Sequence, residues 1–333
     1  MENCKYDGVE VCSYDLKDEW GIYQQNKVVA LKRAATNGYL RCTDCEERVY
    51  LAAGLIREPY FAHYDAKNCP YGKSLESEES RIGKRLIYHL LKNSFPDGDI
   101  HVRHRLDEGF YTSFFVITEE NSKLAIDYRL TQLPIKQFDE RKQYYLSHEI
   151  MPVFFLGVRQ DKNCEQLNWY QQCVQDLFGY CIFFDALAGK VIFKRNFDYQ
   201  VDQFRRNQVF QESYPIQELK LTSTGVFNCD FLENCRFKEE SIKHKLQEQA
   251  NQYKEEQLRQ EIYYQQQIAK NQVEEKARLT ENLIKIIQRV DFYETELKSG
   301  IRRDILLNCI DLIVQGNIDL VSEKYINYIN QYQ

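Results

Sequence analysis

The sequence predicts an α+β protein with a small β-rich N-terminal module, an α/β core built on a mixed sheet, and a long helical, coiled-coil-like C-terminal region. Three observations predict this fold class. Strand-like runs separated by turns fill the first part of the chain, helical and strand-like periods then alternate, and the stretch from Val226 to Ser299 contains neither glycine nor proline. We therefore expect four regions, at 1–73, 74–195, 196–236 (a linking segment) and 237–333.

The composition is that of a globular chain without a global attraction to nucleic acid. Hydrophobic residues make up 43% of the 333 positions, which is enough for a packed core. The 44 lysines and arginines against 50 aspartates and glutamates give a formal net charge of −6, so any contact with DNA has to be local. The first residues lack a signal-peptide pattern and no apolar run reaches the length of a membrane span, so we expect a cytoplasmic location.

The N-terminal region consists of short strand-like runs, and the segments between them contain few apolar residues. The runs that read as strands are NKVVALKRA, GYLRC, RVYLAAG and PYFAHY. A unit of this size has a small core, so a covalent or metal staple would add much to its stability.

Four potential metal ligands fall in this module. Cys42 and Cys45 form a C-x2-C pair, with seventeen residues before His63 and five residues between His63 and Cys69. These are the ligand types and the number of a tetrahedral structural site, so we predict a structural Zn2+ on Cys42, Cys45, His63 and Cys69. The alternatives are an incidental cluster beside an aromatic-flanked histidine and a redox C-x2-C pair, although no thioredoxin-like context surrounds it.

The core region begins with a helix over SLESEESRIGKRLIYHLLKNS, opened by Ser74 and closed before Pro96. The later elements alternate between strands and helices. They are the strands HVRHRL, FYTSFFVI and KLAIDYRL, the helix IKQFDERKQYYLSHE, the strand MPVFFLG, the helix NCEQLNWYQQCVQDLF, and the strands YCIFFDA and KVIFKR. This order predicts a mixed sheet covered by helices.

The region from about Phe237 is rich in lysine, glutamate and glutamine, with apolar residues at spacings of three and four. This pattern predicts a long amphipathic helix of the coiled-coil type. The helix could fold back on its own domain, but we expect it to bind a protein partner or to self-associate. The segment after it predicts two short helices around Gly316.

Several motifs in residues 25–160 occur in a familiar order: "YLRCTDCEERVYLAAG", "PYFAHY" and "CPYG", then "ESEESRIGK" at a helix start and "AIDYRL" on a strand. In this order they resemble the competence protein CoiA-like family. The resemblance implies a zinc-ribbon-like module joined to a nuclease-like domain of the PD-(D/E)xK type. In that family a helix supplies a glutamate in an E-S-x-x-H-x-x-x-K pattern, one strand supplies an aspartate, and the next strand supplies an acid-x-Gln or acid-x-Lys.

The catalytic pattern of that family is incomplete in this chain. Glu76 and Lys84 match the helix motif and Asp127 matches the strand acid, but Arg129 stands two residues further on and Phe114 occupies about the place of the middle aspartate. Arginine keeps its proton near neutral pH, so Arg129 could hold a phosphate but could not act as a general base. One aspartate beside a fixed positive charge is also a weak magnesium site. We therefore predict an inactivated remnant, with Mg2+ bound only if the site is active.

Three functions remain open. The favoured one is a nucleic-acid-binding or scaffolding pseudoenzyme, set in a bacterial DNA-processing or phage-defence assembly. The residues expected to contact DNA are Arg81, Lys84, Arg85, Arg103, Arg105 and Arg129. The second is an active Mg2+-dependent deoxyribonuclease in which Asp107 or Glu108 replaces the missing acid. The third is a structural interaction module without nucleic-acid contact.

Overall fold

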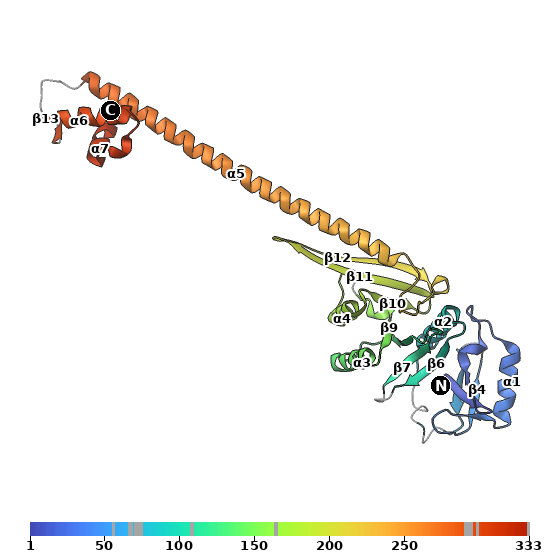
Figure 1. Ribbon diagram of the computed structural model, residues 1–333. Coiled ribbons are helices and arrows are strands. Elements are labelled where there is room, and N and C mark those ends of the chain that lie inside the picture. The colour runs from blue at the N-terminus through green and yellow to red at the C-terminus, as the bar shows by residue number, and fades with distance from the viewer. Residues whose placement is uncertain are drawn as a thin grey trace. The chain divides into compact units, whose positions relative to one another are not determined.

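The computed structural model describes residues 1–54, 57–65, 69, 76–106, 110–162, 166–289, 296–297 and 300–331 (Figure 1). The chain divides into two compact units, Met1–Gln247 and Glu248–Gln333. The first unit holds the N-terminal module and the sheet core, and the second holds most of the longest helix and the short C-terminal elements. The mixed sheet, the helices and the small β-rich module confirm the predicted fold class.

The N-terminal module is built from short strands around a small apolar core. Its strands are β1 (Asn3–Tyr6), β2 (Val9–Cys12), β3 (Leu40–Arg41), β4 (Val49–Ala52) and β5 (Tyr60–His63), with the 3-10 helix η1 (Ser13–Leu16) after β2. β1 pairs antiparallel with β2 and β3, and β4 pairs antiparallel with β5. The β4–β5 hairpin carries the chain from the C-x2-C pair out and back to His63.

One run of this module differs from its prediction. NKVVALKRA reads as a strand in the sequence, but it lies in the helix α1 (Gln25–Thr36). The buried residues Val28, Leu31, Ala34 and Ala35 are spaced by three and four, which is the helical period, and they pack into the module core. The two adjacent valines suggested β structure, while the alanines, leucine and lysines around them favour a helix. The strand prediction for this run was wrong.

The core sheet of the first unit has the strand order β12-β11-β10-β9-β8-β7-β6. β8, β9 and β10 are parallel to one another, and the other neighbouring pairs are antiparallel. The strands are β6 (Asp99–Arg105), β7 (Tyr111–Ile117), β8 (Lys123–Arg129), β9 (Ile150–Gly157), β10 (Cys181–Asp185), β11 (Lys190–Val201) and β12 (Phe204–Pro215). The mixed sheet predicted from the element order is present, and β6 and β12 form its two edges.

Helices cover both faces of this sheet (Figure 1). α2 (Glu78–Ser94) packs on one face, and α3 (Ile135–Ser147) and α4 (Trp169–Phe178) pack on the other. Gly83 allows α2 to approach β8 closely, because a Cβ at this glycine would lie 2.3 Å from a ring carbon of Tyr128. The cap of α2 is Ser77, whose side chain accepts a hydrogen bond from the amide of Ser80. The expected start at Ser74 lies outside the described residues.

The expected linking segment at 196–236 is largely part of the sheet instead. β11 and β12 pair along their whole lengths, from Lys190 opposite Pro215 to Val201 opposite Phe204. The strand predicted at KVIFKR ends at Arg195, whereas β11 continues to Val201. Half-buried and exposed residues do alternate along much of β12, as expected for an edge strand with one face toward solvent. The 3-10 helix η4 (Ile216–Glu218) follows.

The long C-terminal helix is present, as predicted. α5 spans Phe231–Arg289, and its first turns bury Phe231, Cys235, Ile242 and Leu246 in the core of the first unit. From 251 to 278 nearly every residue is exposed. None of the described helices combines the length and the apolar character that crossing a membrane requires.

The second unit has a small apolar core of its own. Two of its helices, α6 (Arg303–Val314) and α7 (Glu323–Gln331), lie on either side of Gly316, as predicted. The other elements are the strands β13 (Glu296–Leu297) and β14 (Ile301–Arg302) and the 3-10 helix η5 (Ile318–Leu320). The core joins Leu279 of α5 to apolar residues of α6 and α7.

Candidate functional site

Cys42, Cys45, His63 and Cys69 converge in the N-terminal module. One ligand atom from each lies within 4.8 Å of the others. The Sγ atoms of Cys42 and Cys69 are 3.8 Å apart, and Sγ of Cys45 lies 3.2 Å from Nε2 of His63. Two thiolates bound at about 2.3 Å to one tetrahedral ion are about 3.8 Å apart, so the spacing fits a metal site. The predicted cluster is confirmed as a group that could hold a structural metal ion.

The local backbone supports this cluster. The amide of Asp44 donates a hydrogen bond to Sγ of Cys42 at 3.4 Å, which orients the turn between the two cysteines. Burial and the nearby positive N-terminus lower the pKa of His63, so its ring is neutral and able to ligate a metal near pH 7. Four protein ligands would close a tetrahedral shell, so an ion here would stabilise the module rather than bind a substrate.

Asp127 lies in the middle of the sheet, on β8 between β7 and β9, and only 1% of it is exposed. Nη1 of Arg141 donates to its Oδ2 at 3.2 Å, and the hydroxyl of Tyr145 donates to the same oxygen at 2.9 Å. Oδ1 lies 3.6 Å from Nη2 of Arg129. The carboxylate is therefore neither on an edge strand nor facing water.

The electrostatics around Asp127 disfavour a cation. Two guanidinium groups, from Arg129 and Arg141, face one carboxylate, which leaves a local excess of positive charge. Burial, reinforced by the charge of Asp127, raises the pKa of Tyr145, so its hydroxyl stays protonated and donates. A divalent ion would have to displace these donors and overcome repulsion from both arginines.

Glu76 and Lys84 form a second, separate cluster. Nζ of Lys84 lies 2.6 Å from Oε1 of Glu76 and 2.7 Å from Oε1 of Glu2. Burial alone would raise the pKa of Glu2, but Lys84 and the N-terminal amine outweigh it and lower the pKa to about 2. Burial likewise opposes the charge of Lys84, and Glu2 and Glu76 overcome it to raise the pKa of this lysine. The cluster joins the N-terminal module to α2.

The two clusters lie on opposite faces of the sheet. Side chains alternate along a strand, so Asp127 and Arg129 share one face of β8 while Tyr128 points to the other. Tyr128 packs in the apolar core with α2, the helix that carries Lys84, whereas Asp127 contacts α3. The structure therefore brings Glu76 to Lys84 and Asp127 to Arg129, but it does not bring the two pairs together.

The position assigned to the missing middle aspartate also falls on the face of α2. Phe114 is fully buried there, with ring centroids 6.4 Å from Tyr14 and 6.5 Å from Tyr88. On the face of Asp127 the nearby residue of β7 is Ser113, whose hydroxyl accepts from the amide of Tyr128. The two acids considered as replacements, Asp107 and Glu108, lie outside the described residues. Within the described ranges, the Cys/His cluster is the group that brings three or more potential metal ligands together.

The basic residues expected to contact nucleic acid fall into different environments. Lys84 is held by its two glutamates, and Arg85 is buried against Glu58 at 3.1 Å, with Lys17 on the same carboxylate. The guanidinium of Arg81 lies 4.4 Å from the ring centroid of Tyr60. Arg103 and Arg105 line a groove, described next, and Arg129 is partly exposed beside Asp127.

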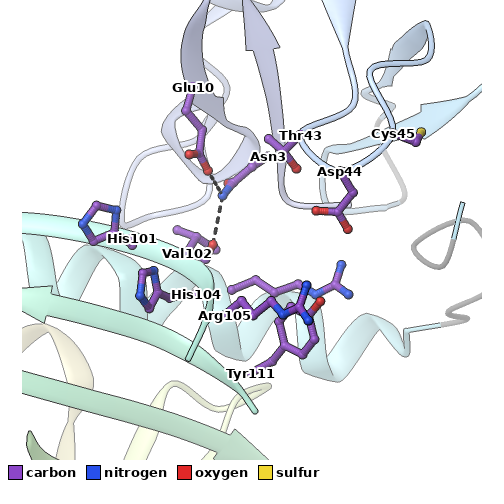
Figure 2. Close-up of a pocket in the computed structure, with 11 residues that line it drawn as sticks. Asn3, Glu10, Thr43, Asp44, Cys45, His101, Val102, His104, Arg105 and Tyr111 are labelled. Atoms are coloured by element: carbon purple, nitrogen blue, oxygen red, sulfur yellow. Dashed lines mark hydrogen bonds between the residues drawn. The ribbon is translucent and has the colours of Figure 1, made fainter. Parts of the chain in front are cut away.

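This groove lies between β6 and the N-terminal module and has a volume of about 610 Å³ (Figure 2). One wall is the edge strand β6, and the other comes from β1, β2 and the turn between Cys42 and Cys45. Nδ2 of Asn3 donates a hydrogen bond across the groove boundary to the carbonyl of Val102 at 3.0 Å. It also donates to the carboxylate of Glu10 within the N-terminal module (Figure 2). The lining residues are Asn3, Glu10, Thr43, Asp44, Cys45, His101, Val102, Arg103, His104, Arg105 and Tyr111.

The resemblance places Arg141 and Tyr145 on a closing helix, but the sequence does not show the contacts that these and several other site residues make. Arg141 and Tyr145 are spaced by four on α3, which places them on one helical face, but nothing in the sequence says that this face meets Asp127. Glu2 lies 82 residues before its partner Lys84, and Asn3 lies 99 residues before its partner Val102. Only the fold brings these partners together.

A Cys/His cluster that could hold a metal ion precedes a helix, three strands, a helix and a strand, which is the order expected of a nuclease-like core behind a small N-terminal module. Residues 23–72 match the N-terminal domain of competence protein CoiA, and residues 76–186 match its nuclease-like domain. Both matches occur in the expected order, so the resemblance to the CoiA-like family that the motifs predicted is confirmed. No curated protein and no solved structure matches the chain.

Proposed function

We propose that this chain is a nuclease-like protein that binds nucleic acid without cleaving it. The observation that carries the proposal is the pairing of Asp127 with Arg141 and Tyr145 on the face of the sheet away from Glu76 and Lys84. Metal-dependent cleavage of a phosphodiester needs carboxylate oxygens that share an ion beside the scissile bond. A carboxylate that neutralises two arginines does not supply them.

Binding of nucleic acid is supported by two features. The chain matches the nuclease-like domain of a competence protein, and Arg103 and Arg105 line the groove beside the N-terminal module. A DNA-processing or phage-defence assembly in a bacterium is the setting that we propose. The three thiolates and the histidine of the module favour Zn2+ as its ion, because this donor set suits a tetrahedral structural zinc.

The test measures cleavage and binding on the same full-length protein. Plasmid, single-stranded DNA and RNA are incubated with Mg2+ or Mn2+, and binding of labelled strands is followed by fluorescence anisotropy. We expect binding without cleavage. A metal-dependent cut that disappears in Asp127→Ala would establish an active nuclease instead, and absence of any binding would leave a purely structural interaction module.

The C-terminal helical region contributes a contact for another protein in this proposal. Leu258, Ile262 and Val273 of α5 are each about half exposed or more, at 57%, 49% and 67%. Apolar side chains on one long helix are covered when a second helix packs along it. Sedimentation of the full chain over a range of concentrations would show self-association; a monomer throughout would direct the search to a different protein.

A further inference from the structure

The groove beside β6 presents flat ring faces in fixed positions. The ring of His104 stacks on Phe115 with a centroid distance of 4.7 Å and an interplanar angle of 16°, and the ring of His101 stacks on it at 6.3 Å and 29°. Phe115 is buried, so it supports the two imidazoles from behind. Tyr111 is 37% exposed, and the guanidinium of Arg103 lies 4.9 Å from its ring centroid. Aromatic faces with an arginine beside them are surfaces on which unpaired bases stack.

The charges of the groove are balanced rather than uniformly positive. The groove is lined by the two cations Arg103 and Arg105 and by the two carboxylates of Glu10 and Asp44. Two arginines can hold one or two phosphates, but they do not form the broad basic surface that follows a duplex backbone. Carboxylates accept hydrogen bonds from the amino groups of bases, and an unpaired base exposes its whole Watson–Crick edge to such acceptors.

The backbone of β6 is strained where it lines the groove. Arg103 has a φ of 51°, in the left-handed region that a residue with a side chain rarely adopts. Val102 and His104 keep their partners on β7, whereas Arg103 is missing from the strand ladder. The strict alternation of side chains is broken there, so residues 101 to 105 all contribute to the groove. Strain of this kind is retained where the surrounding structure fixes it, often at binding sites.

We propose that this groove binds an unpaired strand of nucleic acid, with a base stacked on the wall of His101, His104 and Tyr111 and its phosphates on Arg103 and Arg105. Its volume is that of a small-ligand site and accepts about one or two nucleotides. The proposal rests on the proposed nucleic-acid binding and specifies the form that is bound. The turn carrying Asp44 lies between Cys42 and Cys45, so an ion bound by these residues would hold one wall of the groove in place.

The experiment compares one labelled oligonucleotide as a single strand and as a duplex, as DNA and as RNA, by fluorescence anisotropy with the full chain. We expect the single strand to bind about tenfold more tightly than the duplex. Tyr111→Ala should weaken this binding by about tenfold, because one base stack is worth about 1–3 kcal/mol. Tyr111→Phe keeps the ring and should bind normally. A preference for either sugar supports the proposal, since the groove offers faces for bases and charges for phosphates.

Arg105→Glu provides a second variant at an exposed position, so its effect does not depend on a buried contact. The matched control is Arg205→Glu on β12, an exposed arginine on the opposite edge strand that pairs with Asp198. Arg105→Glu should weaken binding and Arg205→Glu should not. Equal or tighter binding of the duplex, or unchanged binding by Arg105→Glu, overturns this inference while the proposed function stands. Failure to bind any nucleic acid overturns both.

Discussion

Arg141 donates a hydrogen bond to Oδ2 of Asp127 at 3.2 Å, joining α3 to the central strand β8 inside the protein. Tyr145, one helical turn further along α3, donates to the same oxygen. The resemblance predicts an acid at this position, and in this structure that acid belongs to a buried ion pair. We expect this pair to hold the helix against the sheet, and this expectation has consequences that can be measured.

Asp127→Ala should lower the stability of the protein strongly. The substitution leaves the guanidinium of Arg141 buried without its counter-ion, which costs about 3–5 kcal/mol in comparable cases. Urea denaturation of the first unit, followed by circular dichroism, would measure the loss. Asp139→Ala is the control, because Asp139 is exposed on α3, the helix that carries Arg141. This substitution should change stability by no more than about 0.5 kcal/mol. Equal stability of wild type and Asp127→Ala would contradict a structural role.

Lys84→Met should weaken the attachment of the N-terminal module to α2. The substitution leaves the carboxylates of Glu2 and Glu76 without the ammonium group that bridges them, and we expect a loss of about 3 kcal/mol. Lys92→Met, an exposed change on the same helix, is the control. Differential scanning calorimetry of both variants would show whether only Lys84, which is partly buried and bridges two glutamates, affects stability.

The same lysine makes part of the stability depend on pH. Because the folded pKa of Glu2 is lowered to about 2, below its ordinary 4.5, its contribution is present above pH 4.5 and is lost as the pH falls from 4.5 toward 2. Lys84→Met removes the main attraction that lowers this pKa. The stability difference between wild type and Lys84→Met should therefore shrink as the pH falls through this window. A difference that stays constant between pH 6 and pH 3 would show that Glu2 and Lys84 are not coupled.

Removal of the metal should unfold the N-terminal module. A closed shell of three cysteines and a histidine contributes folding free energy directly, because the unfolded chain has no preformed site. Metal analysis of the purified protein should give one Zn2+ per chain, and Cys45→Ser should lose it. Cys173→Ser changes a thiol of α4 and should keep the ion. If chelation leaves protease sensitivity of the module unchanged, the cluster is not a structural metal site.

The sequence was informative where chemistry or periodicity is local. The four ligands, the strands of the core and α5 were predicted because spacing alone identifies them. α1 was missed because its two adjacent valines suggested a strand, although its apolar residues have the spacing of a helix. β12 was missed because an edge strand with one face toward solvent has a weak apolar pattern. The separation of Asp127 from Lys84 could not be predicted, because it depends on which face of β8 each helix covers. That choice is made by packing over the whole sheet.

The salt dependence of binding gives a further test of how nucleic acid is held. The chain carries a net charge of −6, so attraction to phosphate has to come from a few local cations. Each phosphate contact to a single strand contributes about −0.7 to the slope of log K against log salt concentration, so Arg103 and Arg105 together give a slope of about −1.4. Arg105→Ala should reduce the slope by about 0.7, while Arg205→Ala should leave it unchanged. A slope several times steeper would mean that many cations spread over the surface hold the strand, and the groove would then be only one contact among them.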